Sequence, residues 1–121
     1  MKSQRRDRLL LQDMLDAARE VIHETPATAA LFHADKFRSA YILRQIQIIG
    51  EAAWRIARPI KDRHPAIPWN QIEAMRHVLV HDYFKVNWDR VYETAARDVP
   101  RLTPQIETVL ASLPLDHETP P

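Results

Sequence analysis

The residues best suited to chemistry gather in one stretch, 75–84, which reads MRHVLVHDYF. It holds Arg76, two histidines (His77 and His81) and Tyr83. Imidazole transfers protons well near neutral pH, and a guanidinium keeps its charge and binds phosphate through paired hydrogen bonds. Cleavage of RNA by its own 2′-hydroxyl needs a base, an acid and a positive charge beside the phosphorus. The stretch therefore indicates acid–base chemistry at a phosphate, with His77 as a second imidazole or as a group that orients the phosphate.

Two other interpretations of these residues remain open. An arginine and two histidines on one helix are often structural or solvent-facing in small helical proteins. Glu73, His77 and His81 also recur every four residues, which would place three metal ligands on one ridge of a helix. Such a row spans more than about 10 Å of the helix axis, so one ion cannot bind all three without further ligands.

The spacing of apolar residues predicts the helices that must position this stretch. A first helix is predicted over about 4–23 and a second over about 35–58, each with apolar residues every three or four positions. The proline-rich segment 59–68 reads as a polar loop. A third helix should begin at Trp69 and continue through the candidate stretch.

Two more helices are expected after the candidate stretch. Asn87 should cap a fourth helix, and a last helix should carry an apolar face formed by Leu102, Ile106, Val109, Leu110 and Leu113. These elements predict an all-α fold, an antiparallel helical bundle of four to five helices.

Gly50, the only glycine, lies inside the second predicted helix. Glycine costs about 1 kcal/mol relative to alanine there, and a close contact with another helix would offset this cost. Glu51 follows it, either as a solvated surface carboxylate or as one that points into a cleft beside the histidines.

The spacing of Arg76 and His81 has a consequence for assembly. Five positions apart on an ideal helix, the two side chains project to different sides. They can reach one phosphate only if the helix loosens near His81 or if a second chain contributes. The sequence therefore predicts a composite site at the symmetric interface of a homodimer.

Composition limits the class of protein. With 121 residues, 45% hydrophobic and 27% charged, the chain fits one globular domain, 1–113, followed by a flexible tail, 114–121. It has no cysteine, which excludes thiolate chemistry and is compatible with a reducing cytoplasm. The apolar run 9–11 is too short for a signal peptide or a membrane span. A net charge of +1 argues against coating of long nucleic acids but allows a cleft that holds a few phosphates.

Three segments carry a resemblance to a known family. They are IIGEAA at 48–53, HPAIPW at 64–69, and Met75-Arg76 followed by His81-x-Tyr83-Phe84. Together they closely resemble the HepT-like family of the HEPN superfamily, whose signature is Arg-x-x-x-x-His-x-Tyr. The likeness covers nearly the whole chain. One departure is Asp82, where many relatives carry glycine; its charge would weaken RNA binding or raise the pKa of His81.

The resemblance implies a small, all-helical, dimeric toxin. Many members of the family are metal-independent ribonucleases, typically encoded beside a minimal nucleotidyltransferase antitoxin. It implies that Arg76 and His81 are the nuclease residues and that Tyr83 is the tyrosine adenylylated by the antitoxin. His77 and Glu51 are accessory candidates, and no metal or other cofactor is expected. The alternative is a non-catalytic subunit that docks a minimal nucleotidyltransferase and presents a nucleic acid or nucleotide.

Overall fold

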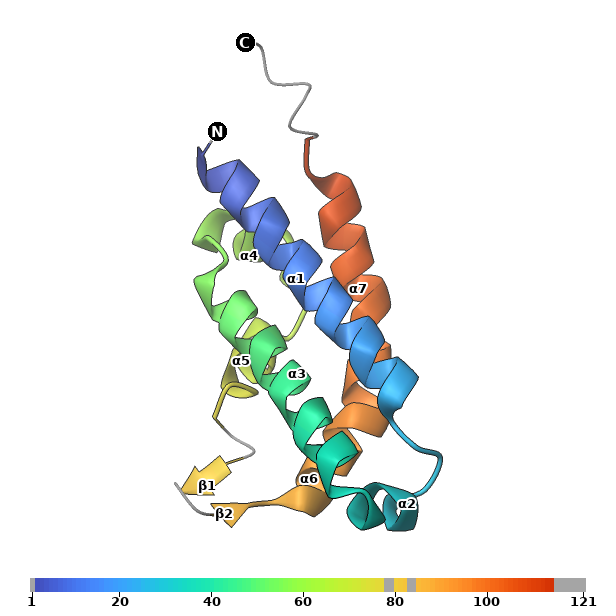
Figure 1. Ribbon diagram of the computed structural model, residues 1–121. Helices are drawn as coiled ribbons and strands as arrows, with labels where there is room; N and C mark the ends of the chain where they lie inside the picture. Colours follow the sequence, from blue (N-terminus) through green and yellow to red (C-terminus); the bar gives the residue numbers. More distant parts are fainter. Residues whose placement is uncertain (1, 78–79, 83–84, 115–121) are drawn as a thin grey trace.

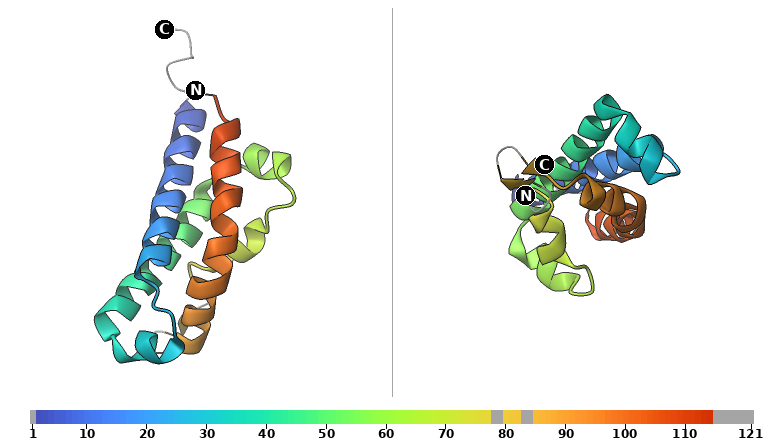
Figure 2. Two further views of the ribbon diagram at one scale, coloured as in Figure 1. Left: turned by 90° about the vertical axis from the view of Figure 1, so that its right-hand side faces the viewer. Right: turned by 90° about the horizontal axis from the view of Figure 1, so that it is seen from below.

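Three long helical segments form the bundle, with short elements at its ends and on one flank (Figure 1). The computed structural model describes residues 2–77, 80–82 and 85–114. Helix α1 (Lys2–Glu24) runs antiparallel to both α3 (Lys36–Arg55) and the C-terminal α7 (Val99–Ser112) and packs against each of them (Figure 1 and Figure 2). The predicted all-α helical bundle is confirmed.

The core is built from the apolar rows that the sequence spacing predicts. Helices α1, α3 and α7 each turn an apolar face inward, because residues three and four apart share one face of a helix. Near the end of α1, Ile22 remains 44% exposed. The fully buried side chains include Leu11, Met14, Val21, Ile42, Ile46, Ile49, Val99 and Ile106.

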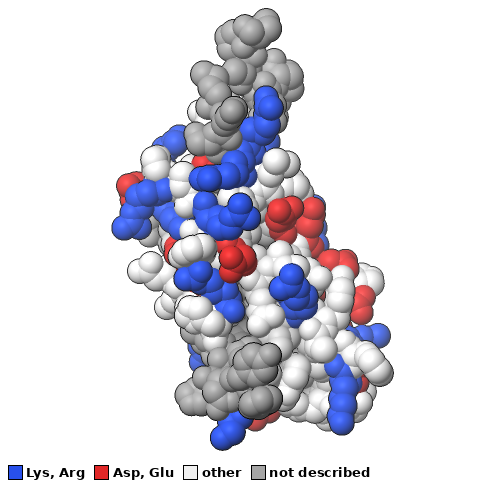
Figure 3. Space-filling view, turned by 60° about the vertical axis from the view of Figure 1, so that its left-hand side comes forward, with Lys and Arg blue, Asp and Glu red and all other residues white. Residues whose placement is uncertain are grey.

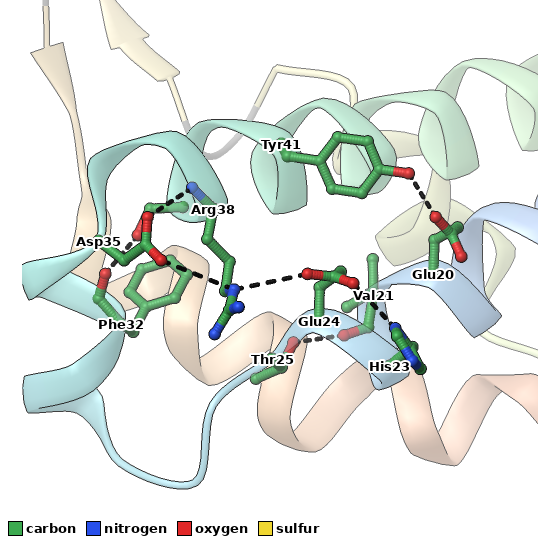
Figure 4. Close-up of polar contacts among 10 residues, drawn as sticks. Glu20, Val21, His23, Glu24, Thr25, Phe32, Asp35, Arg38 and Tyr41 are labelled. Atoms are coloured by element: carbon green, nitrogen blue, oxygen red, sulfur yellow. Dashed lines mark hydrogen bonds and ion pairs between the residues drawn. The ribbon is translucent and has the colours of Figure 1, made fainter.

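Polar side chains fix the helix ends and the contact between α1 and α3. Thr28 caps the short α2 (Ala29–Ala34), and Asp35 caps α3 by accepting from the Arg38 amide. Arg38 also lies 3.4 Å from Glu24 on α1, and the Tyr41 hydroxyl donates to Glu20 (Figure 4). That hydrogen bond is the main reason why the pKa of Tyr41 is raised above its ordinary value of 10.0.

The two C-terminal helices expected from the sequence are continuous. α6 (Trp88–Glu93), the π-helical turn η1 (Thr94–Asp98) and α7 follow one another without a gap. Asn87 caps α6 by accepting from the Arg90 amide, as predicted. The π-turn widens the helix just before Pro100, which has no N–H to donate to the preceding turn. Pro104 lies inside α7, about one turn after Pro100.

The prediction of a long third helix is wrong. Helix α5 spans only Trp69–Ala74, and a two-stranded antiparallel hairpin follows, with β1 (Val80–Asp82) paired to β2 (Lys85–Val86). The segment 78–86 contains three valines and two aromatic residues, types that favour strands. The predicted loop 59–68 also contains a helix, α4 (Arg58–Arg63), with Ile60 and Lys61 buried.

Two further outcomes concern the ends of the chain and the membrane. The predicted tail, from residue 115 onward, lies outside the described residues. Among the helices described, none is long and apolar enough to cross a membrane.

Candidate active site

Arg76 lies in the turn directly after α5, against helix α3. Its guanidinium carbon is 4.1 Å from the centre of the Trp54 ring, in cation–π geometry. The Trp54 side chain is 50% exposed, so this stack lies at the surface of the molecule. The Arg76 Nε atom is buried and has no hydrogen-bond partner in the described part of the chain. The arginine is therefore held by packing, with hydrogen-bonding capacity left unused.

Gly50 permits the close approach that brings Arg76 to this position. A Cβ atom at residue 50 would lie 2.4 Å from the Arg76 backbone nitrogen and 3.0 Å from the Met75 carbonyl carbon. No side chain fits at such distances without a shift of the backbone. The close contact expected at Gly50 is confirmed, and it joins α3 to the turn after α5.

A buried ion pair fixes the other side of α5. The Lys61 Nζ atom donates to the Glu73 carboxylate at 2.8 Å, and the two side chains are 8% and 21% exposed. In addition, the Trp69 indole N–H donates to the His64 carbonyl at 3.1 Å. These contacts tie α5 to α4 and to the loop that follows α4. Arg76 thus emerges from an element that is held on both sides.

The structure describes the other predicted site residues to different extents. His77 is exposed in the turn after α5, and Glu51 is exposed on α3, as a solvated carboxylate would be. His81 lies in β1, but its side chain is outside the described residues, and so is Tyr83 altogether. The roles given to these four residues stay predictions.

The end of α5 at Ala74 removes two arguments made from an ideal helix. Arg76 and His81 do not lie on one helix, so their spacing no longer requires a second chain to bring them together. Glu73, His77 and His81 likewise form no helical ridge, and the Glu73 carboxylate is bound to Lys61. Among the side chains that are described, no group of three potential metal ligands occurs.

Sequence reasoning missed Trp54 and Lys61. A signal for Trp54 was present: it follows Gly50 by four residues, so both share the face of α3 that meets another element. The ion pair of Lys61 with Glu73 had no such signal, because the sequence around Lys61 predicts an exposed polar loop.

A cleft of about 550 Å³ lies between α5 and the continuous helix α6–η1–α7. Its lining includes Met75, Gln71, Arg90, Asp98 and Arg101.

On the face of the molecule shown in Figure 3, Lys and Arg side chains cover more of the surface than Asp and Glu side chains.

Comparison with known proteins agrees with the resemblance seen in the sequence. The family model "Ribonuclease HepT-like" matches residues 12–109. A protein of Thermococcus cleftensis named "Probable ribonuclease HepT" is 34% identical over 99 residues, which cover 80% of this chain and 89% of that protein. A "Putative RNase" of Methanocaldococcus jannaschii is 29% identical over 108 residues, 88% of this chain and 99% of the relative. No solved structure matches. The chain therefore belongs to the HepT-like ribonuclease family.

Proposed function

We propose that this protein is a metal-independent endoribonuclease and the toxin of a toxin–antitoxin pair, with Arg76 and His81 as its catalytic residues. The observation that carries the proposal is the placement of Arg76. Its guanidinium is stacked on Trp54 at 4.1 Å, its backbone is packed against Gly50, and its Nε donor is unused. A donor without a partner costs free energy, and a bound phosphate can recover part of it by reorienting the group.

The proposed reaction is an internal transfer at phosphorus. A histidine accepts the proton of the 2′-hydroxyl, the 2′-oxygen bonds to phosphorus, and the bond to the 5′-oxygen breaks. A second group, acting as an acid, gives a proton to that 5′-oxygen, so the products are a 2′,3′-cyclic phosphate and a 5′-hydroxyl. Arg76 stabilises the charge of the phosphorane. His81 serves as one proton-transfer group, and His77 or His81 of a second copy serves as the other.

Substitution of Arg76 and His81 tests the function. His81→Ala and Arg76→Ala should each lower cleavage of single-stranded RNA by about 10²–10⁴-fold, with the circular dichroism of the helices unchanged. His23→Ala is a matched control, because His23 is an exposed histidine on α1. His77→Ala decides whether His77 is the second imidazole. Activity should persist in a chelator; magnesium-dependent formation of 5′-phosphate products would contradict the mechanism. RNA binding without cleavage by the unaltered chain would favour the non-catalytic subunit.

The proposal includes a minimal nucleotidyltransferase partner that adenylylates Tyr83. Tyr83 follows His81 by two residues, and a phosphodiester on its phenol would compete with RNA phosphate for Arg76. Tyr83→Phe should therefore keep its ribonuclease activity and escape inhibition by the transferase and ATP. Peptide mass mapping should locate the added nucleotide on Tyr83. Modification only at Tyr41 or Tyr92, or full inhibition of Tyr83→Phe by the active transferase, would contradict this part of the proposal.

The proposal also includes a homodimer in the cytoplasm. Its support is the outward face of α3, where Phe37 is 92% and Tyr41 41% exposed. Exposed apolar rows of this kind mark association surfaces.

A further inference from the structure

The cleft between α5 and α6–η1–α7 has the size of a ligand site and is lined by both positive and negative side chains. Its volume of about 550 Å³ is within the range of about 300–1,000 Å³ typical of small-molecule sites. Two arginines, Arg90 and Arg101, and one carboxylate, Asp98, line it together with apolar side chains. The arginines are exposed and Asp98 is half-buried.

The charged groups of the cleft are not used by the fold. Arg90, Asp98 and Arg101 make no side-chain hydrogen bond or ion pair with any residue that the structure describes. Arg38 on α3 differs in this respect, because its guanidinium is paired with Glu24 and Asp35. The cleft therefore offers two free guanidinium groups, which together carry more charge than its one carboxylate.

The widened helical turn helps to form the cleft. Thr94 and Asp98 begin and end η1, and both line the cavity. A π-turn inside a helix is often found at a functional site, because it moves side chains away from the positions of a regular helix. The cleft also reaches Met75, the residue directly before Arg76. Met75 therefore connects the wall of the cleft to the backbone of Arg76.

We propose that this cleft binds one nucleotide of the RNA strand that flanks the scissile phosphate. Arg90 and Arg101 contact the phosphates of that nucleotide, since a guanidinium pairs with two phosphate oxygens. Asp98 and Gln71 lie where they can hydrogen-bond to the edge of the base. The inference rests on the proposed function, because it takes RNA as the substrate. It adds residues that choose and hold the substrate without taking part in the proton transfers.

Binding to an RNA that cannot be cleaved tests the subsite separately from catalysis. The probe is a fluorescent 2′-O-methyl single strand, whose affinity is measured by anisotropy at several salt concentrations with the full chain. Arg90→Gln and Arg101→Gln should each weaken binding about tenfold. The slope of log affinity against log salt should fall by about 0.7 for each phosphate that a variant no longer neutralises. Arg97→Gln is the matched control, because Arg97 is an exposed arginine of η1 that does not line the cleft.

Cleavage kinetics with unmodified RNA give the second measurement. The double variant Arg90→Gln/Arg101→Gln should raise KM at least tenfold and leave kcat within about twofold, because it removes binding that is equal in ground state and transition state. Equal losses in Arg97→Gln would overturn the subsite and indicate general surface charge. Unchanged binding in both cleft variants, with normal cleavage by the unaltered chain, would overturn the subsite and leave the proposed function intact. Arginine-dependent binding without any cleavage would support the subsite and overturn the ribonuclease.

Discussion

The placement of Arg76 depends on a residue that has no side chain. Gly50 lets the backbone of α3 meet the backbone at Met75 and Arg76, and Trp54, one helical turn further on, then lies under the guanidinium. In a helix interior, alanine usually stabilises the helix more than glycine does. At Gly50 the contact reverses that preference.

Gly50→Ala should therefore destabilise the protein and lower its activity. The new Cβ would lie 2.4 Å from the Arg76 nitrogen, so α3 and the turn after α5 must separate. We expect a loss of about 1–3 kcal/mol in the free energy of unfolding, as for other overpacked sites, measured in urea. RNA cleavage should fall as well, because Arg76 moves with its backbone.

A control on the same helix separates packing from helix propensity. Ala40 is exposed on α3, so Ala40→Gly should cost about 1 kcal/mol through propensity alone and leave cleavage unchanged. If Gly50→Ala proves more stable than the unaltered protein, the close backbone contact does not require glycine at this position.

At the scale of elements, local patterns predict the long helices and fail at the site. The rows of α1, α3 and α7 repeat every three or four residues, and a regular period is visible in a single sequence. The row Ile72, Met75, Leu79 has the same period, yet α5 ends at Ala74. The end is set by contacts of Arg76 with Gly50 and by pairing of β1 with β2. Both are tertiary contacts, so no local period reports them.

The ion pair between α4 and α5 should be one of the costliest contacts to break. Lys61→Met leaves the Glu73 carboxylate 79% buried without its partner, given its exposed fraction of 21%. Loss of one member of a buried pair costs about 3–5 kcal/mol, so a loss near the lower end is expected in urea unfolding. The double variant Lys61→Met/Glu73→Leu should recover much of the stability, because no unpaired charge remains.

Recovery in the double variant has a functional readout too. If the pair serves to position α5, the double variant should fold well and still cleave RNA more slowly, because Arg76 follows α5 by two residues. Full stability with full activity would show that the pair is only a structural contact. If Lys61→Met unfolds no more easily than the unaltered protein, the buried Glu73 carboxylate does not need Lys61 for stability, which would contradict this prediction.

At the scale of the whole molecule, the bundle leaves large aromatic side chains of α3 exposed. Helix α3 packs against α1 and α5. Near its N-terminal end Phe37 is 92% and Tyr41 41% exposed, although the Tyr41 hydroxyl reaches Glu20 on α1. These apolar side chains lie on the helix that also carries Trp54 and Gly50. Association of two copies through these exposed side chains is the homodimer that we propose.

The homodimer can be tested by mass and by one substitution. Light scattering at micromolar concentration should give about twice 14.1 kDa. Phe37→Glu should give the mass of one chain, because it places a charge in the apolar face while Phe37 itself is 92% exposed in the single chain. Ile22→Glu is the matched control on α1, where 44% of the residue is exposed, and should remain dimeric. If His81 of each copy serves the other, the monomeric variant loses cleavage, whereas a monomer that still cleaves RNA would contradict the shared site.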